Sequence, residues 1–347
     1  MTAPRPAAAP RYVLWEITRA CNLRCRHCLT RSGAAAPDEL SEAEALAVCD
    51  ALADAGVGAV TLLGGEPLVR PDWEQLAARL AARGVPTSLA TNGVLFDETV
   101  ARRARRAGVN QVVVGLDGRP ATHDRIRGPG TFDRAVAALA VATRRGFPHR
   151  MAITSVHRGN VDDLPALLDV LLEAAPGATW TINFTSVRDN ARMPVAERAD
   201  AKTFLKVAVF VAETRRRLRG RLDVTGAHDL GYHSRCFPDL HNFPWTGCPA
   251  GLETFGITAD GRLKACLALP DELAEADVRG ADLGALWRDP DRFPWNRRFR
   301  PADLRGGCAG CEHGADCRGG CLEFDLTMTG EAHHAPFCLH RSEREDG

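Results

Sequence analysis

Short β-branched stretches alternate with longer amphipathic stretches from residue 11 to about residue 215. Short apolar runs predict buried strands, and apolar residues that recur every three or four positions predict helices. The expected strands are 12–18, 58–63, 86–91, 111–116, 150–156 and 179–185. The expected helices are 41–55, 73–84, 97–107, 131–146, 162–174 and 196–218, and Ser41-Glu-Ala-Glu44 forms a capping box at the start of the first. This alternation predicts an α/β fold whose six βα units form a partial barrel on a parallel sheet.

The alternation stops past residue 220, where the chain becomes rich in Cys, Gly, Pro and Trp. We therefore expect a flexible N-terminus over 1–10, a core barrel over 11–220, and a bridge with a second, irregular domain over 221–347. The second domain has too little periodic apolar sequence to predict a packed core, so bound metal is expected to supply part of its stability.

Composition and charge narrow the class of protein. The chain has 347 residues, 45% of them apolar, which is ordinary for a globular protein. Lys plus Arg and Asp plus Glu both number 44, so no basic excess predicts a nucleic-acid partner. The Arg-rich stretches 102–106 and 215–217 fall in helical patterns and are expected to be solvated faces. No run of about 18 apolar residues predicts a membrane span.

The N-terminal ten residues lack the apolar centre of a signal peptide, so we expect a cytoplasmic protein. The 12 cysteines of the chain are clustered in C-x₂-C and related spacings. In a reducing compartment, this pattern predicts metal ligation rather than disulfides.

Cys21, Cys25 and Cys28 form a C-x₃-C-x₂-C loop directly after the first expected strand. Soft thiolates select iron–sulfur clusters or zinc, and a [4Fe–4S] cube normally takes four of them. Three thiolates on one loop therefore predict a cluster with one iron open to another molecule. The alternative is a zinc site or buried core thiols, but structural zinc usually needs a second ligand pair, and no C-x₂-C pair follows before Cys308.

The segment Trp15-Glu-Ile-Thr-Arg-Ala-Cys-Asn-Leu-Arg-Cys-Arg-His-Cys28 resembles the cluster loop of radical S-adenosylmethionine (SAM) enzymes. The resemblance implies that the open iron chelates SAM. It also implies that an electron from the cluster cleaves SAM to a 5′-deoxyadenosyl radical, which abstracts a substrate hydrogen atom. The family often has an aromatic residue before the third cysteine, where this chain has His27. The family's open six-unit barrel agrees with the expected fold and places the site at the carboxyl ends of the strands.

The turn after the second expected strand, Gly64-Gly65-Glu66-Pro67, resembles the family's GGEP motif. By resemblance, its backbone and Glu66 engage the amino group of SAM. Glycines permit a tight, exposed turn, and a carboxylate accepts hydrogen bonds from an ammonium group. Such a turn alone is weak evidence, but its place behind the cysteine loop makes it a strong prediction.

Two segments after the third and fourth strands add the candidates Asn92 and Asp117 at the barrel rim, where a nucleoside could lie. The segment 123–128 resembles the one whose last arginine binds the SAM carboxylate, which makes Arg127 the candidate because a guanidinium fork matches a carboxylate. A surface ion pair is the alternative for Arg127. Relatives often have Ser where this chain has Gly115, so a hydroxyl contact to SAM is expected to be missing or replaced by backbone.

The C-terminal region resembles the SPASM extension of radical SAM enzymes, which carries two auxiliary [4Fe–4S] clusters. The resemblance implies an outer cluster and an inner cluster with different ligands. The outer ligands would be Cys308, Cys311, Cys317 and Cys338, and the inner ligands Cys248, Cys266 and Cys321. Three [4Fe–4S] clusters and SAM are thus the expected cofactors. Tetrahedral zinc remains the alternative for this array.

The inner cluster needs a fourth ligand, and Cys236 is the upstream cysteine in reach. If Cys236 is instead a buried thiol, the inner cluster keeps an open iron that could bind substrate. Cys49 lies at an apolar position of the first expected helix and is interpreted as core.

Candidate substrate contacts are polar residues at the ends of strands five and six and in the bridge, each with a structural or solvated role as the alternative. They are Ser155, His157, Asn183, Thr185, Ser186, Arg188, His228, Asp229, Tyr232, His233 and His241. Titratable groups near the inner cluster could take up the proton that an oxidised substrate radical loses.

Auxiliary clusters suggest net oxidation of the substrate. The cysteine loop with the segments 27–33 and 37–40 resembles maturases of mycofactocin and pyrroloquinoline quinone, so the first hypothesis is maturation of a ribosomally made peptide. An external flavodoxin- or ferredoxin-like electron donor is expected. Only about ten residues precede the first strand, so a separate leader-peptide-binding protein is expected too.

The second hypothesis is a natural-product enzyme acting on a sugar, an aminocyclitol or aminoglycoside, or a nucleoside, as dehydrogenase, decarboxylase or epimerase. Epimerisation ranks lower because it needs a hydrogen donor, and the unassigned thiols are Cys49 and Cys236. A non-enzymatic electron carrier would leave the GGEP turn and the three-cysteine loop without a purpose.

Overall fold

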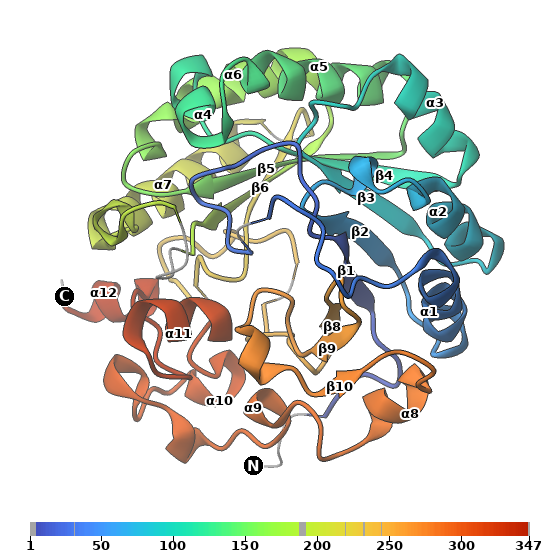
Figure 1. Ribbon diagram of the computed structural model, residues 1–347. Helices are drawn as coiled ribbons and strands as arrows, with labels where there is room; N and C mark the ends of the chain where they lie inside the picture. Colours follow the sequence, from blue (N-terminus) through green and yellow to red (C-terminus); the bar gives the residue numbers. More distant parts are fainter. Residues whose placement is uncertain are drawn as a thin grey trace.

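The computed structural model describes residues 5–30, 32–186, 192–218, 220–231, 233–243 and 245–345. They form one open sheet of ten strands in the order β10-β9-β8-β1-β2-β3-β4-β5-β6-β7 (Figure 1). The strands are β1 Tyr12–Thr18, β2 Val60–Gly64, β3 Thr87–Thr91, β4 Val109–Gly115, β5 His149–Val156, β6 Thr179–Phe184, β7 Asp223–Gly226, β8 Thr254–Ile257, β9 Arg262–Lys264 and β10 Ala276–Asp277. Strands β1 to β7 pair in parallel with their neighbours, and the predicted α/β partial barrel is confirmed.

Helices follow β1 to β6 and lie outside the sheet (Figure 1). They are α1 Glu42–Asp54, α2 Trp73–Ala82, α3 Glu98–Arg106, α4 Pro120–Arg127, α5 Thr131–Arg144, α6 Leu164–Ala174 and α7 Ala201–Leu218. The capping box of α1 is confirmed, because Ser41 Oγ accepts from the Glu44 N–H and the Glu44 carboxylate accepts from the Ser41 N–H at 2.8 Å.

Helix α4 is absent from the sequence prediction. It begins with Pro120 in its first turn and ends at Gly128, whose φ of 135° stops the helix. Of its eight residues, only His123 and Ile126 are buried, so it has no apolar stripe from which to predict a helix. The helix matters for the site because it brings Arg127 back toward the strand ends.

The C-terminal region continues the barrel rather than standing apart from it. Strand β8 pairs in parallel with β1, and β9 and β10 extend the sheet in antiparallel fashion. Phe255, Trp287, Phe293 and Leu322 belong to the same buried apolar cluster as the barrel strands. The sequence pattern could not predict this packing, because the apolar residues come singly from short segments and leave no periodic signal.

Short helices complete this region: α8 Leu283–Arg288, α9 Pro294–Arg297, α10 Gly314–Cys317, α11 Leu322–Thr329 and α12 Leu339–Glu345. An ionic network joins β9 to the end of β1. Asp271 accepts from Arg19 at 2.9 Å, from Lys264 at 3.0 Å and from Arg262 at 3.1 Å. Burial alone would raise the pKa of Asp271, but Lys264 and Arg19 outweigh it and lower the pKa to about 2.

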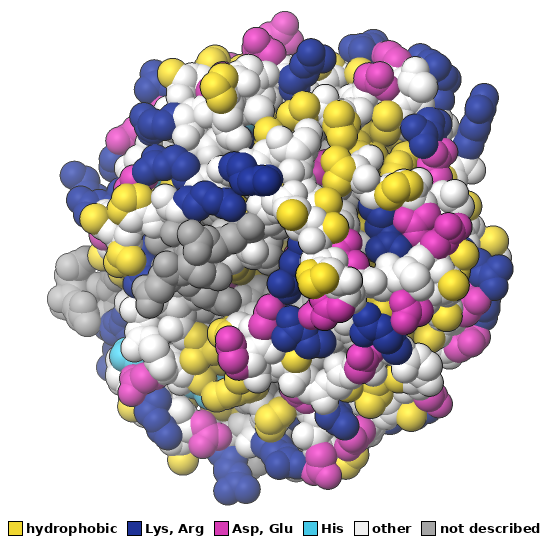
Figure 2. All heavy atoms as spheres, in the orientation of Figure 1, with side chains coloured by type: hydrophobic (Ala, Val, Ile, Leu, Met, Phe, Trp, Pro, Cys, Tyr) yellow, Lys and Arg dark blue, Asp and Glu magenta, His cyan; other side chains and the backbone are white. Residues whose placement is uncertain are grey.

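Acidic and basic side chains are interspersed over the face shown in Figure 2. The predicted solvated face of α3 is confirmed, since Arg103 is 45% exposed and pairs with Glu74. Among the described residues, no helix is both long enough and apolar enough to cross a membrane.

Candidate active site

The loop with Cys21, Cys25 and Cys28 is fixed to the end of β1. Glu39 anchors its start, because the Glu39 carboxylate accepts from the Arg19 N–H at 2.6 Å and from Thr18 Oγ1 at 2.9 Å. The two ends of the loop also contact each other, since the Cys21 N–H donates to the Gly33 carbonyl at 3.0 Å. Both ends of the loop are thus positioned by backbone and carboxylate contacts rather than by the thiols themselves.

The three thiols are partly buried and lie close enough to interact electrostatically. Burial raises the pKa of Cys25 to about 11, with Cys28 and Cys21 adding to the shift. Backbone N–H groups point at two of the sulfurs, from Leu23 to Cys21 Sγ at 3.4 Å and from Ser32 to Cys28 Sγ at 3.3 Å. Converging sulfurs with N–H donors fit thiolate ligation of an iron cluster, because metal-bound sulfur accepts such bonds.

The turn at Gly64 and Gly65 packs directly against the start of this loop. The Gly65 N–H donates to the Thr18 carbonyl at 2.7 Å, and the Glu66 N–H donates to the Ala20 carbonyl at 2.8 Å. A Cβ on Gly65 would lie 2.2 Å from the Ala20 carbonyl oxygen, closer than real Cβ atoms come. Glycine is therefore required here by the close approach of two backbones, and Pro67 then begins the short 3₁₀ segment η1, Pro67–Val69.

Glu66 is fully buried and well supplied with donors. Its carboxylate accepts from Thr91 Oγ1 and the Asn92 N–H, both at 2.7 Å, and from the Leu68 N–H at 3.2 Å. Burial still raises the pKa of Glu66 to about 7. A buried carboxylate of this kind gains from a nearby cation, so its predicted role toward an ammonium group is physically sound. Asn92 also reaches the cysteine loop, donating to Asn22 Oδ1 at 2.7 Å.

Asp117 lies at the centre of a buried charged group after β4. Its Oδ2 accepts from Arg127 Nε at 2.5 Å and lies 2.8 Å from His27 Nε2. Burial alone would raise the pKa of Asp117, but Arg127 and His27 outweigh it and hold the pKa well below its usual range. An ionised Asp117 makes His27 the donor in this contact.

Arg127 is only 12% exposed and also interacts electrostatically with Cys25 and Cys21. Its guanidinium lies over Gly115, where a Cβ would be 2.1 Å from Arg127 Nη2. The glycine that departs from the family's usual serine thus makes room for this arginine. The ion pair named as the alternative for Arg127 exists, but it is buried beside the cysteine loop rather than at the surface.

The C-terminal cysteines gather in two places. Cys248 interacts electrostatically with both Cys266 and Cys321, and burial with the nearby Cys248 raises the pKa of Cys266 to about 12. The other four cysteines line one cavity of about 440 Å³: Cys308, Cys311, Cys317 and Cys338. Both groups of sulfurs have the chemistry for iron–sulfur ligation, and their assignment to an inner and an outer cluster stays a prediction.

The comparisons with known proteins decide the family. The model of the Radical SAM superfamily matches residues 15–206. The chain belongs to the radical SAM superfamily. Mycofactocin maturase MftC of Mycolicibacterium smegmatis is 34% identical over 90% of this chain and 78% of its own length. AdoMet-dependent heme synthase of Methanosarcina barkeri is 28% identical over 96% of this chain and 97% of its own.

The fold of this radical SAM enzyme is also that of SuiB from Streptococcus suis. The two structures align with a TM-score of 0.73 and 18% identity over 94% of this chain and 76% of SuiB. The likeness runs through the C-terminal region, so the predicted SPASM-type radical SAM fold is confirmed. A [4Fe–4S] cluster and SAM follow from the family.

The position of Cys236 in this radical SAM fold differs from that of the inner cysteines. Cys236 is exposed, its N–H donates to Glu343 of α12 at 3.2 Å, and its thiol faces the same carboxylate. Its role as fourth inner ligand stays a prediction. Cys49 is a fully buried core thiol, as expected.

Two carboxylates adjoin the inner cysteines. Cys321 interacts electrostatically with both Glu323 and Asp229. The Phe184 N–H donates to Asp229 Oδ2 at 2.7 Å, Ser186 contacts Glu323, and burial raises the pKa of Asp229 to about 7. The sequence analysis named Asp229 as a candidate but not Glu323. Glu323 lies only two residues after Cys321 in the sequence, which could have indicated it.

Several other candidates have structural partners. His228 and His241 pack against Phe243 and Trp245, and Ser155 Oγ contacts Asn183 at 3.4 Å. The Thr185 N–H donates to the Val156 carbonyl at 2.8 Å and continues the sheet. Arg188 and Tyr232 lie outside the described residues.

His157 is fully buried and should make the radical SAM core sensitive to acid. Its Nδ1 accepts from the Gly159 N–H at 3.0 Å, and burial lowers its pKa to about 4. The unfolded chain, with a histidine pKa near 6.5, binds the proton first as the pH falls, so stability is lost between about pH 6.5 and 4. We expect about 1.4 kcal/mol of this loss between pH 7.5 and 5.5.

Denaturant unfolding of wild type and His157→Asn at both pH values checks this expectation. Asparagine keeps an acceptor near Gly159 but cannot take the proton, so the variant should lose about 1.4 kcal/mol less stability than wild type on acidification. His149→Asn, at an exposed position, is the control and should behave as wild type. Equal acid sensitivity of His157→Asn and wild type would contradict the role of His157.

Proposed function

We propose that this radical SAM enzyme oxidises its substrate by removing one hydrogen atom, then one electron and one proton. The observation that carries this proposal is the pair of carboxylates, Asp229 and Glu323, beside the inner cysteines. A redox centre with a proton acceptor next to it suits a substrate radical that must lose an electron and a proton.

The N-terminal site supports the first step. When bound by Cys21, Cys25 and Cys28, a [4Fe–4S] cluster supplies the electron that cleaves SAM to methionine and the 5′-deoxyadenosyl radical. Glu66 would accept from the ammonium of SAM, and Arg127, which donates to Asp117, would bind its carboxylate. The turn at Gly64 and Gly65 holds Glu66 next to the cysteine loop, because the backbone of the turn donates hydrogen bonds to the backbone at the start of the loop.

The inner cysteines and the carboxylates support the second step. Cys248, Cys266 and Cys321 would hold an inner cluster, which would supply an electron acceptor for the substrate radical. Asp229 or Glu323 would accept the proton. Asp229 Oδ1 is buried without a hydrogen-bond partner among the described residues, so it has a free acceptor position. The outer cluster on Cys308, Cys311, Cys317 and Cys338 would carry the electron onward to a flavodoxin- or ferredoxin-like protein.

The substrate class that we propose is a ribosomally made peptide, presented with a separate leader-binding protein. The MftC relatives, named mycofactocin maturases, support it through 34% identity over most of this chain. SuiB, of the same fold, has been crystallised with its precursor peptide SuiA, so this fold can hold a peptide.

A second candidate substrate is a tetrapyrrole. The specific observation in its favour is the AdoMet-dependent heme synthase relative, which aligns over 97% of its own length. Oxidation at a carboxylate-bearing side chain of a tetrapyrrole would use the same cluster and the same proton acceptors.

The test uses anaerobic, cluster-loaded enzyme with SAM and dithionite. The added substrate is either a candidate precursor peptide with a leader-binding protein, or an iron tetrapyrrole with carboxylate side chains. Mass spectrometry of the substrate and the amount of 5′-deoxyadenosine are measured. A peptide that loses two hydrogens, alone or together with carbon dioxide, supports the proposal, and modification of the tetrapyrrole alone supports the second candidate.

Asp229→Asn tests the proton acceptor in the same assay. We expect 5′-deoxyadenosine formation to persist while oxidised product falls at least about tenfold, because the variant removes a base and not the radical source. Asp169→Asn, an exposed change on α6, is the control. Equal product from Asp229→Asn and wild type would rule out Asp229 as the acceptor.

A further inference from the structure

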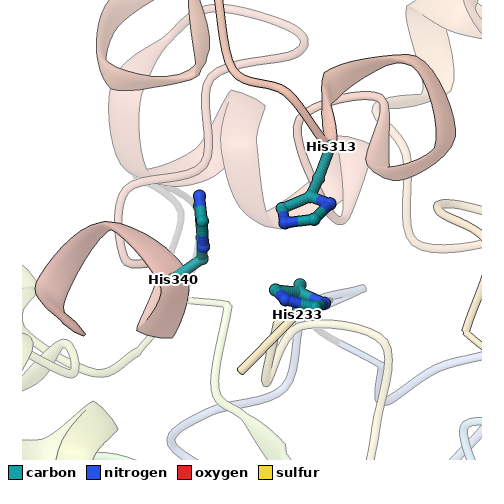
Figure 3. A group of neighbouring side chains, drawn as sticks. All are labelled: His233, His313 and His340. Carbon is teal, nitrogen blue, oxygen red and sulfur yellow. The ribbon is translucent and has the colours of Figure 1, made fainter. Parts of the chain in front are cut away.

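Three histidines from distant segments meet beside the cavity of the outer cysteines. His233 comes from the bridge, His313 from the loop before α10, and His340 from α12 (Figure 3). One ring nitrogen of each lies within 4.8 Å of the others. The rings of His233 and His313 are 3.8 Å apart, and that of His340 lies edge-on 4.6 Å from His313.

His340 is a buried polar group that points into this cluster. It is 9% exposed, and neither ring nitrogen has a hydrogen-bond partner among the described residues. Its Nε2 lies 3.4 Å from the exposed carboxylate of Glu312. Burying an imidazole without partners costs free energy, which a ligand held by the ring would offset.

We propose that His233, His313 and His340 bind a zinc-type divalent cation, with Glu312 in reach as a fourth ligand. Imidazole nitrogen and carboxylate oxygen suit such ions, and a tetrahedral zinc with bonds of about 2.0–2.1 Å needs ligand nitrogens about 3.3 Å apart. The ring nitrogens now lie within 4.8 Å of one another, so binding requires them to approach by up to about 1.5 Å. The Glu312 carboxylate would also balance part of the charge of the cation, and the three neutral imidazoles would add none.

The surrounding charges are compatible with this site. Arg341 and Arg344 line the same cavity, but the Arg341 guanidinium is directed to the carbonyl oxygens of Ala335 and Pro336. A bound cation would join the bridge, the loop at 313 and α12. Because Cys338 precedes His340 by two residues, the cation would hold in place the segment that supplies the last outer cysteine.

The site is independent of the proposed oxidation, so it is tested by binding. Cobalt(II) is titrated into cluster-loaded, chelator-washed enzyme, and its visible absorption, binding stoichiometry and the iron content of the protein are recorded. The proteins are wild type, His313→Ala, His340→Ala and the exposed control His149→Ala. Zinc should displace the bound cobalt.

We expect one cobalt per chain in wild type and His149→Ala, with affinity at least tenfold lower in His313→Ala and His340→Ala at unchanged iron content. Unchanged affinity in both variants overturns the site. Loss of iron from either variant also overturns it, because the histidine would then serve a cluster. Sulfur-to-cobalt charge transfer overturns it too, since the cobalt would then be on cysteine.

Discussion

Replacing Cys21, Cys25 and Cys28 together by alanine should abolish 5′-deoxyadenosine formation and remove about four of about twelve irons per chain. The loss should be limited to about four irons because the three groups of cysteines lie in different parts of the structure. The N-terminal loop is anchored by Glu39 and the GGEP turn, while the inner and outer cysteines lie in the C-terminal region. Anaerobic reconstitution, iron and sulfide analysis and dithionite-driven SAM cleavage measure both effects.

Cys49→Ala is the matched control for the triple variant. It removes a fully buried thiol on the core-facing side of α1, which donates to the Leu76 carbonyl. It should keep all the iron and the SAM cleavage of wild type. A triple variant that still forms 5′-deoxyadenosine, or that contains zinc in place of iron, would contradict the assignment of the loop.

Asp117→Asn should have the second largest effect. It removes the charge that compensates the buried Arg127 guanidinium and leaves that cation beside the cysteine loop. Losing one partner of a buried ion pair costs about 3 kcal/mol of stability. We also expect SAM cleavage to fall at least about tenfold, because both Arg127 and His27 lose their fixed positions.

Denaturant unfolding and the dependence of 5′-deoxyadenosine formation on SAM concentration measure the two consequences of Asp117→Asn. Asp50→Asn is the control, since Asp50 also pairs with two arginines, Arg79 and Arg83, but at the surface of α1. The control should cost less than about 1 kcal/mol. Comparable losses of stability and SAM cleavage in both variants would mean that the pair of Asp117 and Arg127 contributes no more than an ion pair at the surface.

The strands of the barrel could be predicted because each is a short stretch rich in β-branched or apolar residues between longer amphipathic helices. The predicted strand 12–18 coincides with β1, and the predicted 150–156 differs from β5 by one residue. Helix α4 was missed because a mostly polar helix has no apolar period. The packing of β8 and Trp287 on the barrel was missed because single apolar residues in short segments do not indicate their partners.

The same distinction holds for the site. The cysteine loop and the GGEP turn are motifs within short stretches of sequence, so their spacing is visible. Contacts between distant segments, such as Ser186 with Glu323, depend on tertiary structure. The group of His233, His313 and His340 is of this kind, and His233 was considered only as a proton-handling residue of the bridge.

The pairing of β1 with β8 has a consequence for synthesis of the chain. Tyr12 pairs with Thr254, so one edge of the strand before the cysteine loop stays open until most of the chain has left the ribosome. Non-local pairing of this kind slows folding and leaves an unpaired edge available for misassembly. A truncated product that ends before β8 therefore keeps this edge of β1 open and should aggregate more readily than the full chain.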